Sequence, residues 1–132
     1  MANLIYDELL SFGEMNIATG QFPDILNLGR EDGSTDHYPG KDFTSAGRLT
    51  VDVCCKEPAG GTSIAVTVQG SEDGSTGWTD VGKSVSNLEL MKAGPCQTTV
   101  SPNKFKYLRV SIAADGTFTG TAKAYLNTYA GK

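Results

Sequence analysis

The side chains of this sequence that are equipped for chemistry begin with three carboxylates close together in the chain, Glu72, Asp73 and Asp80. Acid–base catalysis by paired carboxylates requires two of them held across a cleft with pKa values that differ. Here they lie in or next to residues 71–77, a stretch rich in Ser, Thr and Gly. Such Asp and Ser side chains usually hydrogen-bond their own backbone, so we interpret the stretch as a turn. A calcium site, which needs several oxygens around the ion, is the alternative.

The other reactive side chains match no known catalytic or metal-binding motif. His37, the single histidine, lies in a polar stretch between Asp36 and Tyr38. Cys54 and Cys55 are adjacent, so in a strand their side chains point to opposite faces and are poorly placed to bond each other. No Gly-x-Ser-x-Gly motif marks an activated nucleophile, and one histidine without Cys-x-x-Cys leaves zinc without ligands. We therefore expect that the protein has no catalytic residues, binds no metal ion or cofactor and is not an enzyme.

Trp78 is the only tryptophan and follows the predicted turn directly. A tryptophan at the end of a hairpin either stacks on a ligand such as a sugar ring or fills the end of a core. The large area that this side chain buries favours the core role, and ligand stacking is the alternative.

Composition excludes several classes of protein. The 132 residues suit one domain, and 39% hydrophobic and 20% charged residues are typical of globular proteins. A net charge of −4 leaves no basic stripe for nucleic acid. Apolar runs are too short for a membrane span, which needs about 18 residues. The N-terminal residues lack the basic and apolar regions of a secretory signal, so we expect a protein that stays in the cytosol unless it leaves within a larger particle.

Alternating apolar and polar residues predict short strands separated by turns. The expected strands cover residues 22–28, 49–55, 63–69, 84–91, 96–100, 104–113 and 118–129. The core-facing side chains are expected to be Leu49, Val51, Val53, Cys55, Ile64, Val66, Val68, Leu108, Val110, Ile112, Ala122, Ala124 and Leu126. Seven or eight such strands with almost no helix predict an all-β fold, an antiparallel β-sandwich or jelly roll.

We expect this single sandwich domain to span residues 21–132, after an N-terminal arm at residues 1–20. The arm carries Leu9, Leu10 and Phe12, three side chains whose exposure to water is unfavourable. It is therefore expected either to pack on the edge of the domain or to be exchanged with a neighbouring subunit. A long polar stretch, 29–47, shows no periodicity and is expected to be a loop.

Four aromatic residues are expected on the outer faces of the two strongest strands. By strand parity, Phe105 and Tyr107 point away from the core in one strand, and Tyr125 and Tyr129 do so in the other. Aromatic side chains are enriched where proteins meet, so this pattern predicts a protein–protein interface. A β-bulge near Tyr107 would turn the first pair inward.

Taken in order, several segments resemble one protein family. They are the Leu-Leu-Ser-Phe ending at Phe12, Asp24-Ile-Leu-Asn-Leu-Gly29, Gly47-Arg-Leu-Thr-Val-Asp-Val53, Val66-Thr-Val-Gln-Gly-Ser-Glu-Asp-Gly74 with Trp78, Lys106-Tyr-Leu-Arg-Val-Ser-Ile112 and Gly120-Thr-Ala-Lys-Ala-Tyr-Leu126. Over about residues 4 to 129 the chain is similar to the capsid cement, or decoration, proteins of tailed bacteriophages. The resemblance implies a jelly-roll protein on the outer surface of the icosahedral head. There it would bridge major capsid protein subunits as a homo-oligomer, a dimer or a trimer, assembled in the host cytoplasm.

Two other functions remain open from the sequence. The Ser-Glu-Asp-Gly turn followed by Trp78 is similar to turns in sugar-binding and discoidin-like sandwiches, which favours a non-catalytic carbohydrate-binding module. A single tryptophan argues against it, because a sugar platform usually has two or three coplanar aromatic rings. Another structural part of a phage, in the tail or neck, is the third reading.

Overall fold

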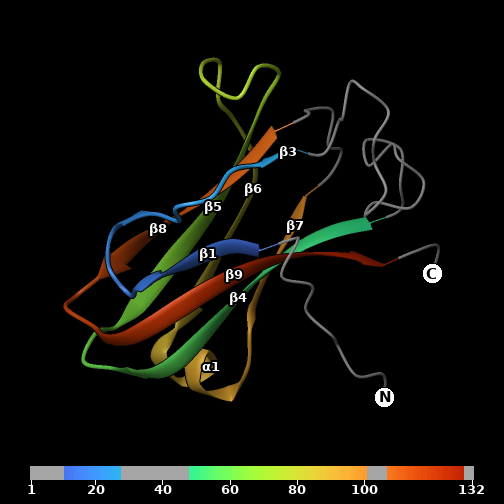
Figure 1. The fold of residues 1–132 in the computed structure, drawn as a ribbon. Helices are drawn as coiled ribbons and strands as arrows, with labels where there is room; N and C mark the ends of the chain where they lie inside the picture. Colours follow the sequence, from blue (N-terminus) through green and yellow to red (C-terminus); the bar gives the residue numbers. More distant parts are fainter. Residues whose placement is uncertain (1–10, 28–47, 101–106, 130–132) are drawn as a thin grey trace.

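Two antiparallel sheets packed face to face make up the chain in the computed structural model, which describes residues 11–27, 48–100 and 107–129 (Figure 1). Sheet A contains, in spatial order, β1 (Ser11–Asn16), β9 (Thr119–Tyr129), β4 (Arg48–Ala59) and β7 (Cys96–Val100). Sheet B contains β2 (Gly20–Gln21), β8 (Tyr107–Asp115), β5 (Ser63–Ser71) and β6 (Thr79–Asn87), with β3 (Leu26–Asn27) also paired to β8. One short helix, α1 (Leu88–Ala93), joins β6 to β7.

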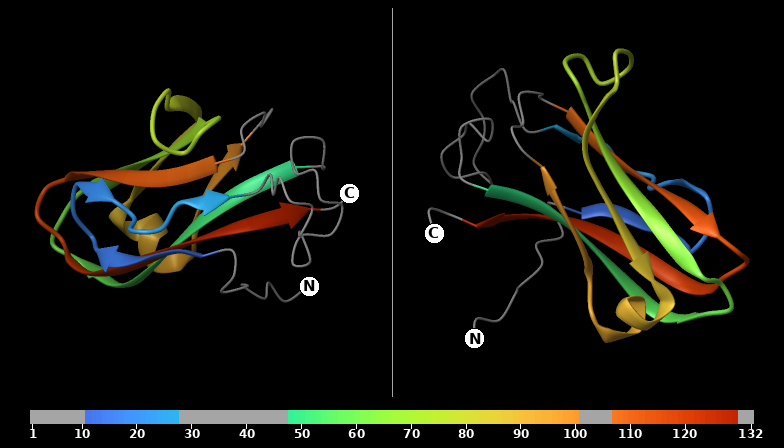
Figure 2. Two further views of the ribbon diagram at one scale, coloured as in Figure 1. Left: turned by 45° about the horizontal axis from the view of Figure 1, so that its top comes forward. Right: turned by 180° about the vertical axis from the view of Figure 1, so that it is seen from behind.

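The strand pairing is that of a jelly roll. The two short strands β2 and β3 both pair with β8 and form one interrupted strand. The pairs are then nested: β1 with β9, β2 and β3 with β8, β4 with β7, and β5 with β6. A long hairpin wound into two sheets gives this order, and the two views of Figure 2 show the layers that result. The predicted all-β sandwich is confirmed.

The core lies between the two sheets and is formed by the side chains that the strand alternation predicts to face inward. The predicted inward residues Val51, Val53, Ile64, Val66, Val68, Leu108, Val110, Ile112, Ala122, Ala124 and Leu126 are all buried there. Cys55 packs against the margin of this cluster. Burial of each larger side chain contributes about 1.5–3 kcal/mol, so these strands supply most of the stabilisation.

Residues 11–20 belong to the sandwich, which corrects the expected boundary of the arm. β1 pairs with β9, and its register shifts between Ser11 and Gly13. That bulge turns Phe12 into the core, where its side chain is fully buried. Phe12 is therefore a core residue of the domain, which agrees with the expected packing of this segment and leaves the side chain unavailable for contact with a partner. Leu9, Leu10 and the rest of residues 1–10 lie outside the described residues.

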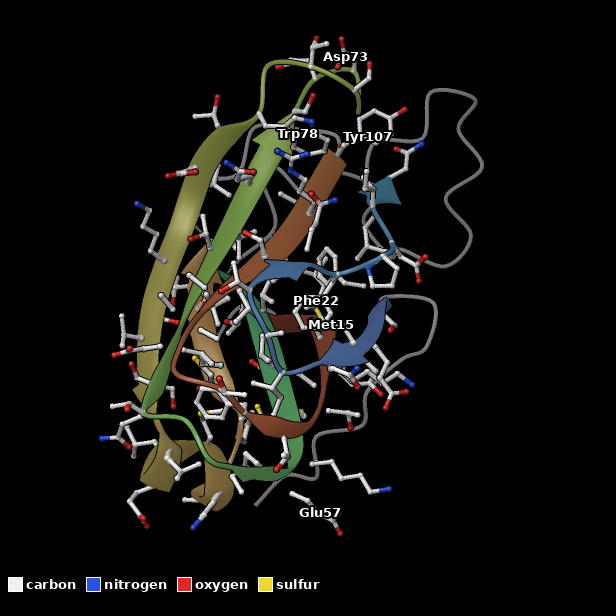
Figure 3. All side chains as sticks on the ribbon, turned by 90° about the vertical axis from the view of Figure 1, so that its left-hand side faces the viewer. Met15, Phe22, Glu57, Asp73, Trp78 and Tyr107 are labelled. Carbon is white, nitrogen blue, oxygen red and sulfur yellow. The ribbon has the colours of Figure 1, made fainter. Side chains whose placement is uncertain are left out.

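Two expected strands have different bounds in the structure. In the predicted strand 22–28 only Leu26–Asn27 is paired, because the chain crosses between the sheets before it. Phe22 N donates to Val110 O of sheet B, whereas Asp24 N donates to Phe12 O of sheet A. Pro23 between them has no N–H to continue a ladder. The crossing buries Phe22 in the core, and Met15 of β1 packs against the same core (Figure 3).

The other is the strand predicted at 84–91, which is shifted in the structure: β6 begins earlier, at Thr79, and a helix replaces the last predicted residues. Asn87 Oδ1 accepts a hydrogen bond from Leu90 N at 2.9 Å and caps α1. The residues that follow are strong helix formers, and a capped turn outweighs the weak alternation there. Met91 points from α1 into the core and fills the gap between the sheets. Among the described residues, no helix has the length and apolar character needed to cross a membrane.

Candidate interaction surfaces

The described residues contain no group of three or more His, Cys, Asp or Glu that could hold a metal ion. The features that remain are surfaces: a hairpin loop, the outer face of each sheet, and a groove beside α1.

The loop between β5 and β6 is a turn stabilised by its own side chains, as predicted. Asp73 Oδ1 accepts hydrogen bonds from the backbone N–H groups of Ser75 and Thr76, each at 2.9 Å. Its other oxygen accepts from Thr76 Oγ1, also at 2.9 Å. The backbone N–H groups, that of Thr76 above all, hold the pKa of Asp73 far below its ordinary value. Ser71 Oγ accepts from Asp73 N and Gly74 N at the base of the loop.

Tyr107 supports this loop from below. The residue lies opposite Ser71 across β8 and β5, on the outer face of sheet B, as strand parity predicts. Its half-buried ring packs so closely under Gly74 that a Cβ there would be 3.0 Å from the ring. Gly74 also has a φ of +81°, which favours glycine. The β8–β5 register is continuous, so the bulge considered near Tyr107 does not occur in this pair.

A row of polar side chains crosses the outer face of sheet B next to Tyr107. Arg109 and Gln69 lie directly opposite each other, and Gln69 lies opposite Asp80. Arg109 Nε donates to Gln69 Oε1 at 2.9 Å, and Gln69 Nε2 donates to Asp80 Oδ1 at 2.9 Å. Asp80 Oδ2 is 3.4 Å from Lys83 Nζ. The hydrogen bond from Gln69 is the main cause that lowers the pKa of Asp80.

Trp78 covers the Arg109 end of this row. Its ring centroid is 4.1 Å from Arg109 Cζ, and the side chain is half-buried (Figure 3). The core role expected for Trp78 is therefore wrong. The reason is a bulge between β5 and β6: Val68 pairs with Gly82 and Gln69 with Asp80, which leaves Val81 as an extra residue. One extra residue reverses the side-chain alternation and puts Trp78 on the outer face.

The remainder of this outer face carries mostly short side chains, with the charged Lys83 and one large apolar residue. Thr67, Ser111 and Lys83 form the next row, followed by Ala65, Ala113 and Val85. Val85 is 70% exposed, the highest value among the large hydrophobic residues described. It stands in β6, which is hydrogen-bonded in sheet B to β5 alone.

A groove of about 350 Å³ lies between the end of β6, α1 and the start of β7. Its lining residues are Ser84, Val85, Ser86, Leu90, Ala93, Gly94, Pro95, Cys96 and Gln97. Leu90 at its margin is 57% exposed. Ser84 Oγ lies 3.3 Å from Cys96 Sγ and 2.6 Å from Thr98 Oγ1. Burial raises the pKa of the Cys96 thiol, which makes this cysteine a poor nucleophile.

The outer face of sheet A differs in one region, where Thr50, Asp52 and Tyr125 are buried, whereas Gln97 and Thr99 in β7 are exposed on the same face. Tyr125 lies opposite both Asp52 and Ser11 and is only 9% exposed, and Asp52 is fully buried. The Lys123 Nζ atom is 5.4 Å from the centroid of the Tyr125 ring. Tyr125 does point away from the core, as predicted, but its burial makes it a packed residue and not the exposed contact that the sequence predicted.

Several predicted positions lie outside the described residues. Phe105 and the polar stretch 29–47, with His37, belong to that part of the chain, and Tyr129 ends β9 with a side chain that is also outside. Sequence reasoning missed Val85, Leu90 and Arg109. The alternation in the predicted strand 104–113 puts Arg109 on the outer face, but its partners depend on a register that the sequence does not reveal.

No family model and no curated protein matches this chain. The functional proposal therefore rests on the surfaces described above and on the resemblance to phage cement proteins.

Proposed function

We propose that this protein is a capsid cement protein. It binds the outer surface of a phage head and bridges major capsid protein subunits, as a homo-oligomer, without nucleic acid, membrane or cofactor. The observation that carries the proposal is the pair of exposed apolar side chains, Val85 and Leu90, beside the groove at β6 and α1. A protein that stays alone in solution gains nothing from this arrangement, whereas a partner that covers it gains apolar burial.

The dimensions of the groove favour a protein partner. Pockets for small-molecule ligands span about 300–1,000 Å³, and this groove of about 350 Å³ is at the lower limit. Most of its lining side chains are small, and none of the described residues that line it is charged. A few apolar side chains of a neighbouring subunit suit such a site better than a polar ligand does.

The fold supports the same role. Jelly rolls are recurrent in viral capsid proteins, although the fold alone does not assign a function. A short chain with two sheet faces and a groove can contact more than one subunit at once. Many weak contacts of this kind, repeated over the head, stabilise a shell through multivalency.

The test is mass spectrometry of gradient-purified phage particles from the source, with the copy number of the chain measured against the major capsid protein. A cement protein is expected at a copy number of the same order as that of the shell subunit. A tail or neck part is expected in only a few copies per particle. Absence from particles would overturn the proposal.

A carbohydrate-binding module is the second candidate, favoured by one observation. Trp78 is half-buried on the outer face of sheet B, and Tyr107 lies on the same face near it (Figure 3). A change in Trp78 fluorescence that saturates with neutral sugars would favour this candidate. The carbohydrate proposal fails if such sugars leave the emission unchanged.

A further inference from the structure

We propose that Arg109, with Trp78 and Gln69, is a receptor for a carboxylate group on the protein partner. The carboxylate belongs to an Asp or Glu side chain of the shell, and this identification of the partner rests on the proposed function. The chemical claim itself, that the site accepts a carboxylate, rests on the geometry of three side chains.

The guanidinium of Arg109 is held in one orientation. Its Nε–H is used by Gln69 Oε1 at 2.9 Å, which fixes one edge of the plane. Trp78 lies over the group, 4.1 Å from Cζ to the ring centroid, and fixes its tilt. Gln69 is itself held by its bond to Asp80. An arginine restrained in this way loses little rotamer entropy when it binds a further group.

The donors that remain on Arg109 suit a carboxylate. Among the described residues, no side chain or carbonyl accepts a hydrogen bond from its terminal nitrogens, and no carboxylate forms an ion pair with it. Gln69 separates Arg109 from Asp80, whose carboxylate is already engaged by Gln69 and Lys83. Two parallel N–H groups on a fixed plane match the two oxygens of a carboxylate.

The surroundings leave room for an incoming side chain. The neighbouring positions on the same face, Ser111 and Thr67, carry short side chains. Arg109, Gln69 and Trp78 are each half-buried, so part of each reaches solvent. A half-buried position strengthens a charged hydrogen bond relative to a fully exposed one. The chain carries a net charge of −4, so an acidic partner is repelled by most of its surface. The positive charge of Arg109 therefore favours approach of such a partner at this site.

Trp78 makes the site directly observable, since it is the only tryptophan in the chain. The purified protein is titrated with N-acetylglutamate, at constant ionic strength, while Trp78 fluorescence is recorded. We expect a saturable change with half-saturation on the order of 10 mM, as for a single small-molecule contact. N-acetylglutamine amide, which has nearly the same shape and no carboxylate, serves as the matched probe and should bind at least about threefold more weakly.

Three variants define the site. Arg109→Gln should abolish the difference between the two probes, and Arg109→Lys should reduce it because lysine lacks the planar fork. Lys83→Gln is the control, because it removes a different cation on the same face, one that is paired with Asp80. This variant should distinguish the two probes as the unmodified protein does. No saturable response to N-acetylglutamate, or an equal response in Arg109→Gln, would overturn the proposal. A response to neutral sugars alone would overturn it and favour the carbohydrate module.

Binding to particles tests the partner separately. Arg109→Gln should bind particles stripped of this chain about tenfold more weakly than the unmodified protein does. If the titration succeeds but Arg109→Gln binds particles normally, the carboxylate does not come from the shell, and that part of the proposal is overturned. The titration needs no particles. Its result therefore tests the carboxylate site even if the protein proves not to be a cement protein.

Discussion

The outer faces of the two sheets follow the same alternation but differ in what they expose. On sheet A, Asp52 and Tyr125 are buried although both point away from the core. On sheet B, the outward side chains of Gln69 and Arg109 are half-buried, and Val85 is 70% exposed. Alternation therefore tells on which side of a sheet a residue lies, but not whether that side faces solvent.

This difference assigns separate roles to the two faces. The region of the outer face of sheet A around Asp52 and Tyr125 is part of the packed structure, so substitutions there should reduce stability. The outer face of sheet B, with its free strand β6 and the groove beside α1, should tolerate substitution but lose partner binding.

The largest effect is expected from a matched pair of tyrosine substitutions. Tyr125→Ser on sheet A should lower the free energy of unfolding by about 3 kcal/mol, because it empties a buried site. Tyr107→Ser on sheet B should lower it by about 1 kcal/mol, because the ring is half-exposed and mainly supports the loop at Gly74. Urea denaturation of both variants measures the two values. Equal losses would contradict the assignment of a packed and an open face.

A substitution that fills the groove should separate binding from stability. Ala93 is exposed and lines the groove, so Ala93→Trp should occupy part of its volume and weaken particle binding about tenfold. Lys92→Trp, on the same helix but outside the lining, is the control. Co-sedimentation with stripped particles gives the affinities, and thermal melting should show similar stability for the two variants. A normal affinity for Ala93→Trp would remove the groove from the interface.

The smallest effect concerns the loop at the end of sheet B, and it depends on pH. Because the pKa of Asp73 is lowered in the folded state, its carboxylate stabilises the fold fully above the unfolded pKa of about 3.9. That contribution is lost as the pH falls from there towards the folded value. Asp73→Ala should therefore melt at a lower temperature than the unmodified protein at pH 7, and the difference should shrink below about pH 3.9.

Glu72→Ala is the control for this loop, since Glu72 is the neighbouring exposed carboxylate. It should melt like the unmodified protein at both pH values. A difference for Asp73→Ala that does not change with pH would show that the loop is stabilised by something other than the ionised carboxylate.

The sequence predicted the strands that are governed by simple alternation. β5 and β8 each place three predicted apolar residues in the core, since neither contains a bulge within its inward run. The Asp73 turn was also predictable, because its hydrogen bonds are local. Such features depend on residues within a few positions of each other in the chain.

Most of the errors come from local features that alternation does not reveal. These features are a single extra residue in a strand and a residue that caps a helix. Val81 in β6 turns Trp78 outward, and the bulge at the start of β1 turns Phe12 inward. Asn87 starts a helix where the pattern suggested a strand. The burial of Tyr125 could not be predicted either, because it depends on what packs on the far side of its sheet.

The most direct measurement of the central claim compares two exposed apolar residues near opposite edges of sheet B. Val85 lies on the proposed docking surface, and Ile25, which is 41% exposed, lies between β2 and β3. The affinities of Val85→Asp and Ile25→Asp for stripped particles are measured by co-sedimentation. We predict that Val85→Asp binds at least about tenfold more weakly, since a charge would be buried without a partner, and that Ile25→Asp binds normally. Normal binding by Val85→Asp, or an equal loss in both variants, would contradict the account.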